Sequence, residues 1–356
     1  MARCALRRLV VAAGAALLGG SCIPADQPYW VIDHTDALSM RIEVAQRGPY
    51  GSLEPPSGGP VLEAMPGDRV RITPFIAGPD GPVPPGSLAP RFYACDRSSC
   101  NEATRGLVDA RPCRAVPVPN DETCFIGQGD GVEFEVGGFT DLIAAVTVGV
   151  PVIMIAGTPE GPDTAECVRR LGKIEEQAAS LRDCLLFVRT LRIGPAWRAL
   201  LVAAVTGVET PIEPDALPWQ VTQIEPDVPP TIAGFTAWVP AAGGGEAFVE
   251  LPREGTLTVR AGSRVGLSLV VGAPPQQYML LSIDPDGDDA GASVTSETRA
   301  AAWFSSASGA FALDSSQGLD VTWQAPEEPG EVFVYAVLAD IRSSDVAWFR
   351  VEVEPG

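Results

Sequence analysis

The densest group of potential metal ligands in the sequence is Asp284-Pro285-Asp286-Gly287-Asp288-Asp289, where four carboxylates fall within six residues. Calcium takes six to eight oxygen ligands on flexible loops, and alternating aspartates supply such oxygens. The loop lacks the distal glutamate of an EF-hand at the expected place, so Glu297 would have to reach in from elsewhere. Asp-Pro and Asp-Gly pairs are also standard turn formers. Two interpretations follow: a calcium site made by Asp284, Asp286, Asp288 and Asp289, or a plain turn.

Catalytic constellations are not supported by the remaining residue types. His34 is the only histidine and lies near the start of the first predicted domain, so a Ser-His-Asp or Cys-His arrangement would depend on a domain edge. The glycines of 127–131 are followed by no lysine and no helix, so they predict a turn and not a phosphate loop. Glu175-Glu176 and Glu327-Glu328 are neighbours in sequence, so their side chains tend to point apart into solvent. We therefore predict no catalytic residue and no enzyme, with a carboxylate hydrolase as the least favoured alternative.

The cysteines indicate disulfide chemistry. The chain has eight cysteines. Cys4 lies in an N-terminal segment predicted to be removed, Cys22 directly follows that segment, and six remain. An even remainder in an oxidising compartment predicts three disulfides. Cys167 and Cys184 stand apart and form the expected pair, whereas the connectivity of the others is left open: Cys95, Cys100, Cys113 and Cys124. A four-thiolate zinc site is the alternative for these four, although their spacings are not those of a zinc ribbon.

The N-terminus has the three parts of a signal peptide. Arg3, Arg7 and Arg8 form a positive head, and Leu9–Leu18 is an apolar stretch too short to span a bilayer. Small residues then precede Cys22, and the order Leu18-Gly19-Gly20-Ser21-Cys22 resembles the bacterial lipobox, with its leucine displaced by one place. We expect cleavage after Ser21 and lipid on Cys22; the alternative is an ordinary signal peptide that leaves Cys22 as a structural thiol. Ile23, which is not acidic, favours the outer membrane by the same resemblance.

Composition excludes some partners. The formal net charge is −20, and Lys173 is the only lysine, so the surface repels phosphate backbones and nucleic-acid binding is not expected. The longest apolar run after the signal, Leu142–Ala156, is broken by Gly149 and Pro151 and predicts buried strands, not a membrane span. The lipid on Cys22 would therefore be the membrane attachment.

The positions of turns and apolar residues predict a mainly β chain. Gly and Pro together are abundant (37 and 34 residues) and cluster between β-type runs. In the first half the expected strands are Leu38–Ala45, Arg69–Ala77, Arg91–Ala94, Val132–Val136, Val146–Ala156 and Cys184–Ile193. Thr164–Arg182 has helical periodicity with Thr164 as the expected cap, and a Cys167–Cys184 disulfide would clip this insertion to the strand that follows.

A proline-rich linker, 209–230, separates this half from a second set of short strands. These are Thr231–Val239, Ala247–Leu251, Gly255–Arg260, Arg264–Val271, Met279–Ile283, Ala301–Ser305, Gly309–Leu313, Leu319–Trp323, Glu331–Ala339 and Ala347–Glu354. Their number and spacing fit one sandwich of ordinary size, with Trp303, Phe304, Trp323 and Trp348 in its core. The stiff linker is expected to hold this second domain further from the membrane than the first.

Several short motifs resemble a known group of proteins. They are the lipobox, the strand Ala37–Ile42, the turn Pro66-Gly67-Asp68, and Trp323-Gln324-Ala325-Pro326 followed by Pro329-Gly330-Glu331-Val332. In these the chain is similar to myxobacterial-type envelope lipoproteins with immunoglobulin-like or PKD-like domains. The resemblance spans both halves, and it implies an envelope location and a fold but no particular activity.

These observations combine into one predicted organisation: signal peptide 1–21, tether 22–28, an Ig-like β-sandwich 29–208 with a helical insertion at about 160–184, linker 209–230, and a second Ig-like β-sandwich 231–356. The expected function is that of a non-enzymatic, outer-membrane-anchored structural or interaction module. Its expected partners are the membrane and another envelope protein or an extracellular polymer. The alternative is a calcium-stabilised adhesion module that binds glycan or protein.

Overall fold

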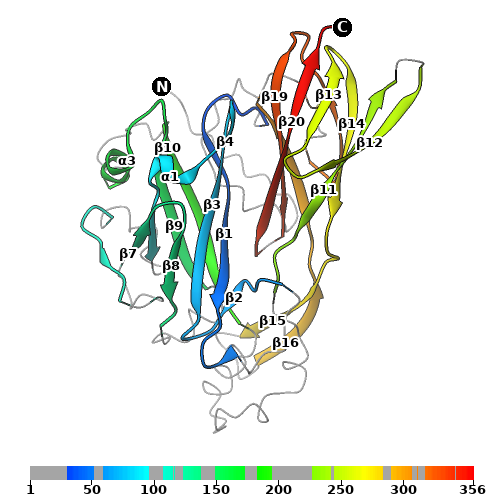
Figure 1. Cartoon of the computed structure of the whole chain (residues 1–356). Coiled ribbons are helices and arrows are strands. Elements are labelled where there is room, and N and C mark those ends of the chain that lie inside the picture. Colours follow the sequence, from blue (N-terminus) through cyan, green and yellow to red (C-terminus); the bar gives the residue numbers. More distant parts are fainter. Residues whose placement is uncertain are drawn as a thin grey trace.

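The computed structural model describes residues 30–51, 59–95, 107–114, 116, 123–137, 149–172, 183–194, 227–241, 244–283, 290–306, 311, 317–340 and 342–356. The signal peptide, Cys22, Cys100, most of the proline-rich linker and the loop Asp284–Asp289 lie outside these ranges, so the predictions that concern them stay predictions. The described chain is mainly β and forms four larger sheets that lie in layers (Figure 1).

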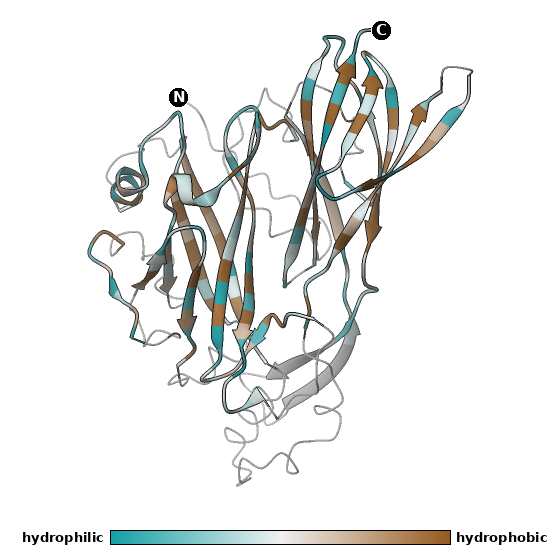
Figure 2. Ribbon diagram, in the orientation of Figure 1, coloured by the Kyte–Doolittle hydropathy of each residue, from teal (hydrophilic) through white to brown (hydrophobic). Residues whose placement is uncertain are grey.

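The first two layers make the N-terminal sandwich. Sheet I contains β1 (Asp36–Gln46), β3 (Arg69–Gly78), β4 (Gly81–Val83) and β8 (Val132–Glu135). Sheet II has the order β2 (Glu63–Ala64), β10 (Cys184–Ile193), β9 (Val150–Gly157), β5 (Arg91–Cys95), β7 (Thr123–Gln128) and β6 (Arg111–Pro112). Alternate apolar residues of both sheets meet between them, and the brown stripes along these strands in Figure 2 follow that alternation.

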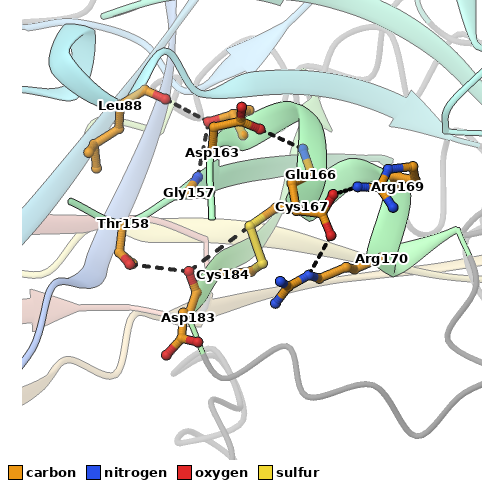
Figure 3. Close-up of a disulfide and its surroundings, with 11 residues drawn as sticks. Leu88, Gly157, Thr158, Asp163, Glu166, Cys167, Arg169, Arg170, Asp183 and Cys184 are labelled. Atoms are coloured by element: carbon orange, nitrogen blue, oxygen red, sulfur yellow. Dashed lines mark hydrogen bonds and ion pairs between the residues drawn. A yellow bond between two sulfur atoms is a disulfide. The ribbon is translucent and has the colours of Figure 1, made fainter. Parts of the chain in front are cut away.

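A helical insertion covers the outer face of sheet II. Helix α3 (Thr164–Leu171) packs Val168 and Leu171 on Tyr93 and Ile153 of the sheet; a shorter helix, α1 (Pro85–Leu88), follows β4. The disulfide Cys167–Cys184 clips the insertion to β10, as the sequence predicts (Figure 3).

The predicted cap of α3 was wrong by one residue. The Asp163 carboxylate accepts a hydrogen bond from the Glu166 amide at 2.7 Å, which makes Asp163 the N-cap. The Thr164 hydroxyl instead donates to the Leu88 carbonyl at 2.6 Å and accepts from the Gly157 amide at 3.0 Å. Thr164 therefore ties the insertion to its neighbours, a use that depends on tertiary contacts.

A second disulfide resolves part of the open connectivity. Cys113 and Cys124 are joined, with an S–S distance of 2.03 Å. Cys95 is also disulfide-bonded. The other described cysteines form the pairs Cys113–Cys124 and Cys167–Cys184, so the partner of Cys95 lies outside the described residues. A zinc site shared by these thiols is thereby excluded.

The other two layers make the C-terminal sandwich. Sheet III has the order β13 (Thr256–Arg260), β20 (Ser344–Glu354), β19 (Gly330–Ala339) and β17 (Ala300–Ser305), with β13 parallel to β20. Sheet IV has the order β12 (Glu246–Pro252), β11 (Ile232–Pro240), β14 (Arg264–Val271) and β18 (Asp320–Gln324). Trp303 and Trp323 fill the core between them, as predicted. A separate hairpin pairs β15 (Gln277–Ile283) with β16 (Ala290–Ser296), a strand that the sequence analysis did not predict.

The two sandwiches pack against each other, so the segment between them does not keep them apart, and the predicted distance of the second domain from the membrane stays a prediction. Leu38 of sheet I packs with Phe304 and Val346 of sheet III in a shared apolar cluster. The buried Tyr335 hydroxyl donates to the Gly78 carbonyl at 2.9 Å, and burial raises its pKa, so the donor proton is retained. Sheet III is apolar on both faces, which explains why it is covered on both sides (Figure 1).

The Cys167→Ser/Cys184→Ser variant is expected to lose about 3 kcal/mol of unfolding free energy, because the bridge closes a loop of 17 residues. Chemical denaturation of the oxidised protein measures this. Either single serine variant breaks the same bridge and serves as the comparison. A midpoint equal to that of the wild type would contradict the predicted role of the clip.

Candidate functional site

Buried acidic and arginine side chains meet where the two sandwiches join. We define the junction cluster as five residues, each at most 8% exposed: Glu63, Asp227, Glu297, Asp340 and Arg342. Glu63 belongs to β2 of the first sandwich, and Asp227 precedes the first strand of the second. Glu297 follows β16, while Asp340 and Arg342 form the turn between β19 and β20. Burial of a charge is costly unless the charge is paired, so the contacts within the cluster decide whether the junction is stable.

The Arg342 guanidinium is the centre of the cluster. Its Nη2 lies 2.8 Å from Glu297 Oε1 and 2.9 Å from Asp227 Oδ1. Its Nη1 lies 3.4 Å from Glu63 Oε1, so one arginine reaches carboxylates of both sandwiches and of the segment between them. This fork of donors suits a set of carboxylates better than a point charge would.

Backbone groups hold the carboxylates in place. Asp340 Oδ1 accepts from the amides of Arg342 and Ser343 at 2.6 and 2.5 Å, which builds the tight turn that carries Arg342. The Gln276 amide donates to Glu297 Oε2 at 3.0 Å. The Leu62 amide donates to the carbonyl of Asp227 at 2.8 Å, so the described end of the linker is fastened to the first sandwich.

The pKa values of Asp227 and Glu297 are shifted in opposite directions. Burial, against the pull of Arg342, and the neighbouring carboxylates Glu63 and Asp340 together raise the pKa of Asp227 to about 9. Burial also opposes ionisation of Glu297, but hydrogen bonds from the Gln276 amide, Asp227 and Arg342 bring its pKa below the ordinary value. Within the described chain no amide or guanidinium makes a hydrogen bond to either Asp227 oxygen, as expected for a neutral carboxyl that is itself the donor.

A further arginine lies at the cluster. Arg189 of β10 is 5% exposed, and burial lowers its pKa to about 10, while Asp340 and Asp227 oppose that shift. Arg299 lies 3.3 Å from the second oxygen of Glu297. Arg189 and Arg299 therefore add two positive side chains to that of Arg342 at the junction cluster.

Three carboxylates of the cluster also satisfy the distance requirement of a metal site. One oxygen each of Asp227, Glu297 and Asp340 lies within 4.8 Å of the others. However, Nη2 of Arg342 stands within 3 Å of two of these groups, and Asp227 keeps its proton at neutral pH. The donor set therefore fits an internal ion network better than a divalent cation.

No sequence pattern predicted the junction cluster. Glu297 was considered only as a distant ligand for the Asp284–Asp289 loop, but its carboxylate is bound to Arg342 and the Gln276 amide. The one local signal was Asp340-Ile341-Arg342-Ser343, a charged turn between two strongly apolar strands. His34 is exposed and lies 2.6 Å from Asp33, outside the junction cluster.

Comparisons with known proteins give no family for the chain. No protein-family model matches it, and no curated protein matches it. Among solved structures, a nucleoside hydrolase-related hypothetical protein from Saccharophagus degradans, described as associated with carbohydrate metabolism, aligns at 16% identity over 52% of this chain, with a TM-score of 0.19. Dimeric latent PorU from Porphyromonas gingivalis aligns at 10% identity over 89%, also with a TM-score of 0.19. The alignments span 38% and 34% of those chains, and likenesses this weak carry no functional argument.

Replacing Arg342 by methionine should cost about 3 to 5 kcal/mol of unfolding free energy, because it leaves buried carboxylates without their cation. Denaturant unfolding at neutral pH measures the loss. Arg350→Met is the matched control on β20, the strand that follows the Arg342 turn: Arg350 pairs with Glu331 and Glu352 while 42% exposed, so its loss should cost under about 1 kcal/mol. Equal effects of the two variants would contradict the role assigned to Arg342.

Asp227 should make stability fall as pH rises. Above the ordinary carboxyl pKa the unfolded chain releases the proton, whereas the folded chain keeps it up to a pKa of about 9. The unfolding free energy therefore decreases through that window, by at most about 1.4 kcal/mol per pH unit. Asp227→Asn removes this titration, so between about pH 5 and about pH 8 the variant should gain stability relative to wild type.

Unfolding curves at several pH values test this prediction, with the exposed Glu328→Gln as control. A constant difference between Asp227→Asn and wild type across the pH range would show that Asp227 is ionised in the folded protein.

Proposed function

We propose that the protein is a non-enzymatic structural and interaction module, anchored to the bacterial envelope through lipid on Cys22. The observation that carries this proposal is the junction: a buried ion network and a shared apolar cluster join both sandwiches into one support. Such an arrangement suits a protein that presents a surface at a fixed distance and angle.

The chemistry of the shifted groups supports the same proposal. A perturbed pKa in an open cleft would favour catalysis. Here the carboxyl groups of Asp227, Glu297 and Asp340 are at most 6% exposed and contact Arg342 or the backbone of its turn. Their shifted pKa values therefore have a structural use. Within the described residues, no helix is long and apolar enough to cross a bilayer.

Envelope anchoring is tested by expressing the full chain in a Gram-negative host. Wild type should fractionate with the outer membrane, and Cys22→Ser should move to the soluble periplasmic fraction, because one thiol carries the lipid. Cys4→Ser is the matched control, since Cys4 is removed with the signal peptide, and it should remain membrane-bound. Mass spectrometry of the mature N-terminus gives the cleavage site. A wild type found in the soluble fraction would overturn the anchor.

A further inference from the structure

Sheet IV has one face in the core and one face in solvent. Along its strands, alternate residues such as Val265, Leu267 and Trp323 point inward and are buried. The opposite positions are exposed or partly exposed, and they include three large apolar side chains. Phe248 is 55% exposed, Val270 40% and Trp238 37%. We define the aromatic face as the outward residues of sheet IV: Trp238, Phe248, Thr236, Glu246, Glu250, Arg264, Gly266, Ser268, Val270, Asp320, Thr322 and Gln324.

The centre of this face is an ordered aromatic pair. Trp238 on β11 stands directly opposite Phe248 on β12, and the two rings make an edge contact with centroids 5.6 Å apart. On its other side Trp238 is opposite Gly266, where an added Cβ would touch the indole at 3.5 Å. Because residue 266 is a glycine, no side chain covers the indole from the position directly opposite on β14. The pair is therefore positioned by its neighbours and still open to a partner, as are the aromatic anchors of many protein interfaces.

The charges around the aromatic pair are acidic. Glu246 and Glu250 flank Phe248 on β12, and Asp320 on β18 accepts a hydrogen bond from the Ser268 hydroxyl. The one basic outward residue of sheet IV, Arg264, lies two residues from Gly266, on the side of Trp238 opposite to Glu250 and Asp320, so these two carboxylates gather at the Thr236 end of the indole. An indole face bounded by carboxylates attracts a cation both through the ring and through ion pairing.

The backbone adds a second feature. Within the described chain β12 pairs with β11 alone and lies at the outer margin of the molecule (Figure 1). An edge strand of this kind presents amide and carbonyl groups to an extended peptide. Its two outward glutamates oppose pairing with a second copy of itself, because the carboxylates of the two copies would face one another.

We propose that the aromatic face binds a cationic, extended protein segment, with an arginine or lysine over Trp238, its charge paired with Glu250 and attracted at longer range by Asp320. This proposal names the partner class of the interaction module proposed above and rests on that function. Charge complementarity favours this occupant over an anionic polymer and over self-association. The open backbone edge favours a peptide over a neutral glycan.

Binding is tested with the full-length protein in detergent and a peptide in which Arg alternates with Ser. Trp238→Ala and Glu250→Gln/Asp320→Asn should each weaken binding about 3- to 10-fold, the size expected for one cation–π contact or a close ion pair. Glu327→Gln/Glu328→Gln removes the same charge from exposed positions outside the face and should leave affinity within about twofold. Circular dichroism of each variant checks that the fold is retained.

Two results would overturn the proposal. Equal weakening by both pairs of charge variants, with no effect of Trp238→Ala, would reduce the binding to diffuse electrostatics. Trp238-dependent binding of a soluble neutral glucan, without binding of the Arg peptide, would assign the face to a glycan. Both results leave fractionation of the Cys22→Ser variant unchanged, so failure of the face and failure of the anchored module are distinguished.

Discussion

The arrangement of the two sandwiches depends on one arginine held among buried carboxylates. Arg342 contacts Glu63, Asp227 and Glu297 from a turn that Asp340 builds. If the sandwiches separated, these groups would become hydrated, so the network alone gives modest net stability. Its stronger effect is on geometry, because a docking that buried these groups without bringing them together would leave unpaired charges. The ion network therefore selects one arrangement, and the adjacent apolar cluster around Tyr335 supplies the burial that stabilises it.

This docking divides the sheets into two kinds. Sheets I and III face each other across the junction and are covered on both sides, whereas sheet IV has a free outer face. Helix α3 covers the outer face of sheet II at the opposite end of the stack. The exposed aromatic pair Trp238 and Phe248 thus lies on the layer furthest from the first sandwich. The four-layer order explains why an interaction surface would be found there.

Much of the fold followed from local patterns. The long strands β1, β3, β10, β14, β19 and β20 coincide with predicted runs, because period-2 alternation or continuous apolar sequence is a strong signal. Strand β16 was missed because Ala290–Ser296 is poor in large apolar residues and pairs only within its hairpin. The cap of α3 was misplaced because Asp163 and Thr164 are both good caps, and the contact of Thr164 with Leu88 decides between them.

The sequence by itself determined the mainly β class, the turns, and the pairing of Cys167 with Cys184, since these depend on neighbours within about twenty residues. Tertiary structure alone decided the junction cluster. Its members are spread from Glu63 to Arg342, and each is an unremarkable charged residue in its local sequence. Their properties come from burial: removal of water raises the pKa of Asp227, and the buried guanidinium of Arg342 needs the nearby carboxylates of Glu63 and Glu297. Burial at a contact between distant segments depends on how the sheets stack, which no local pattern contains.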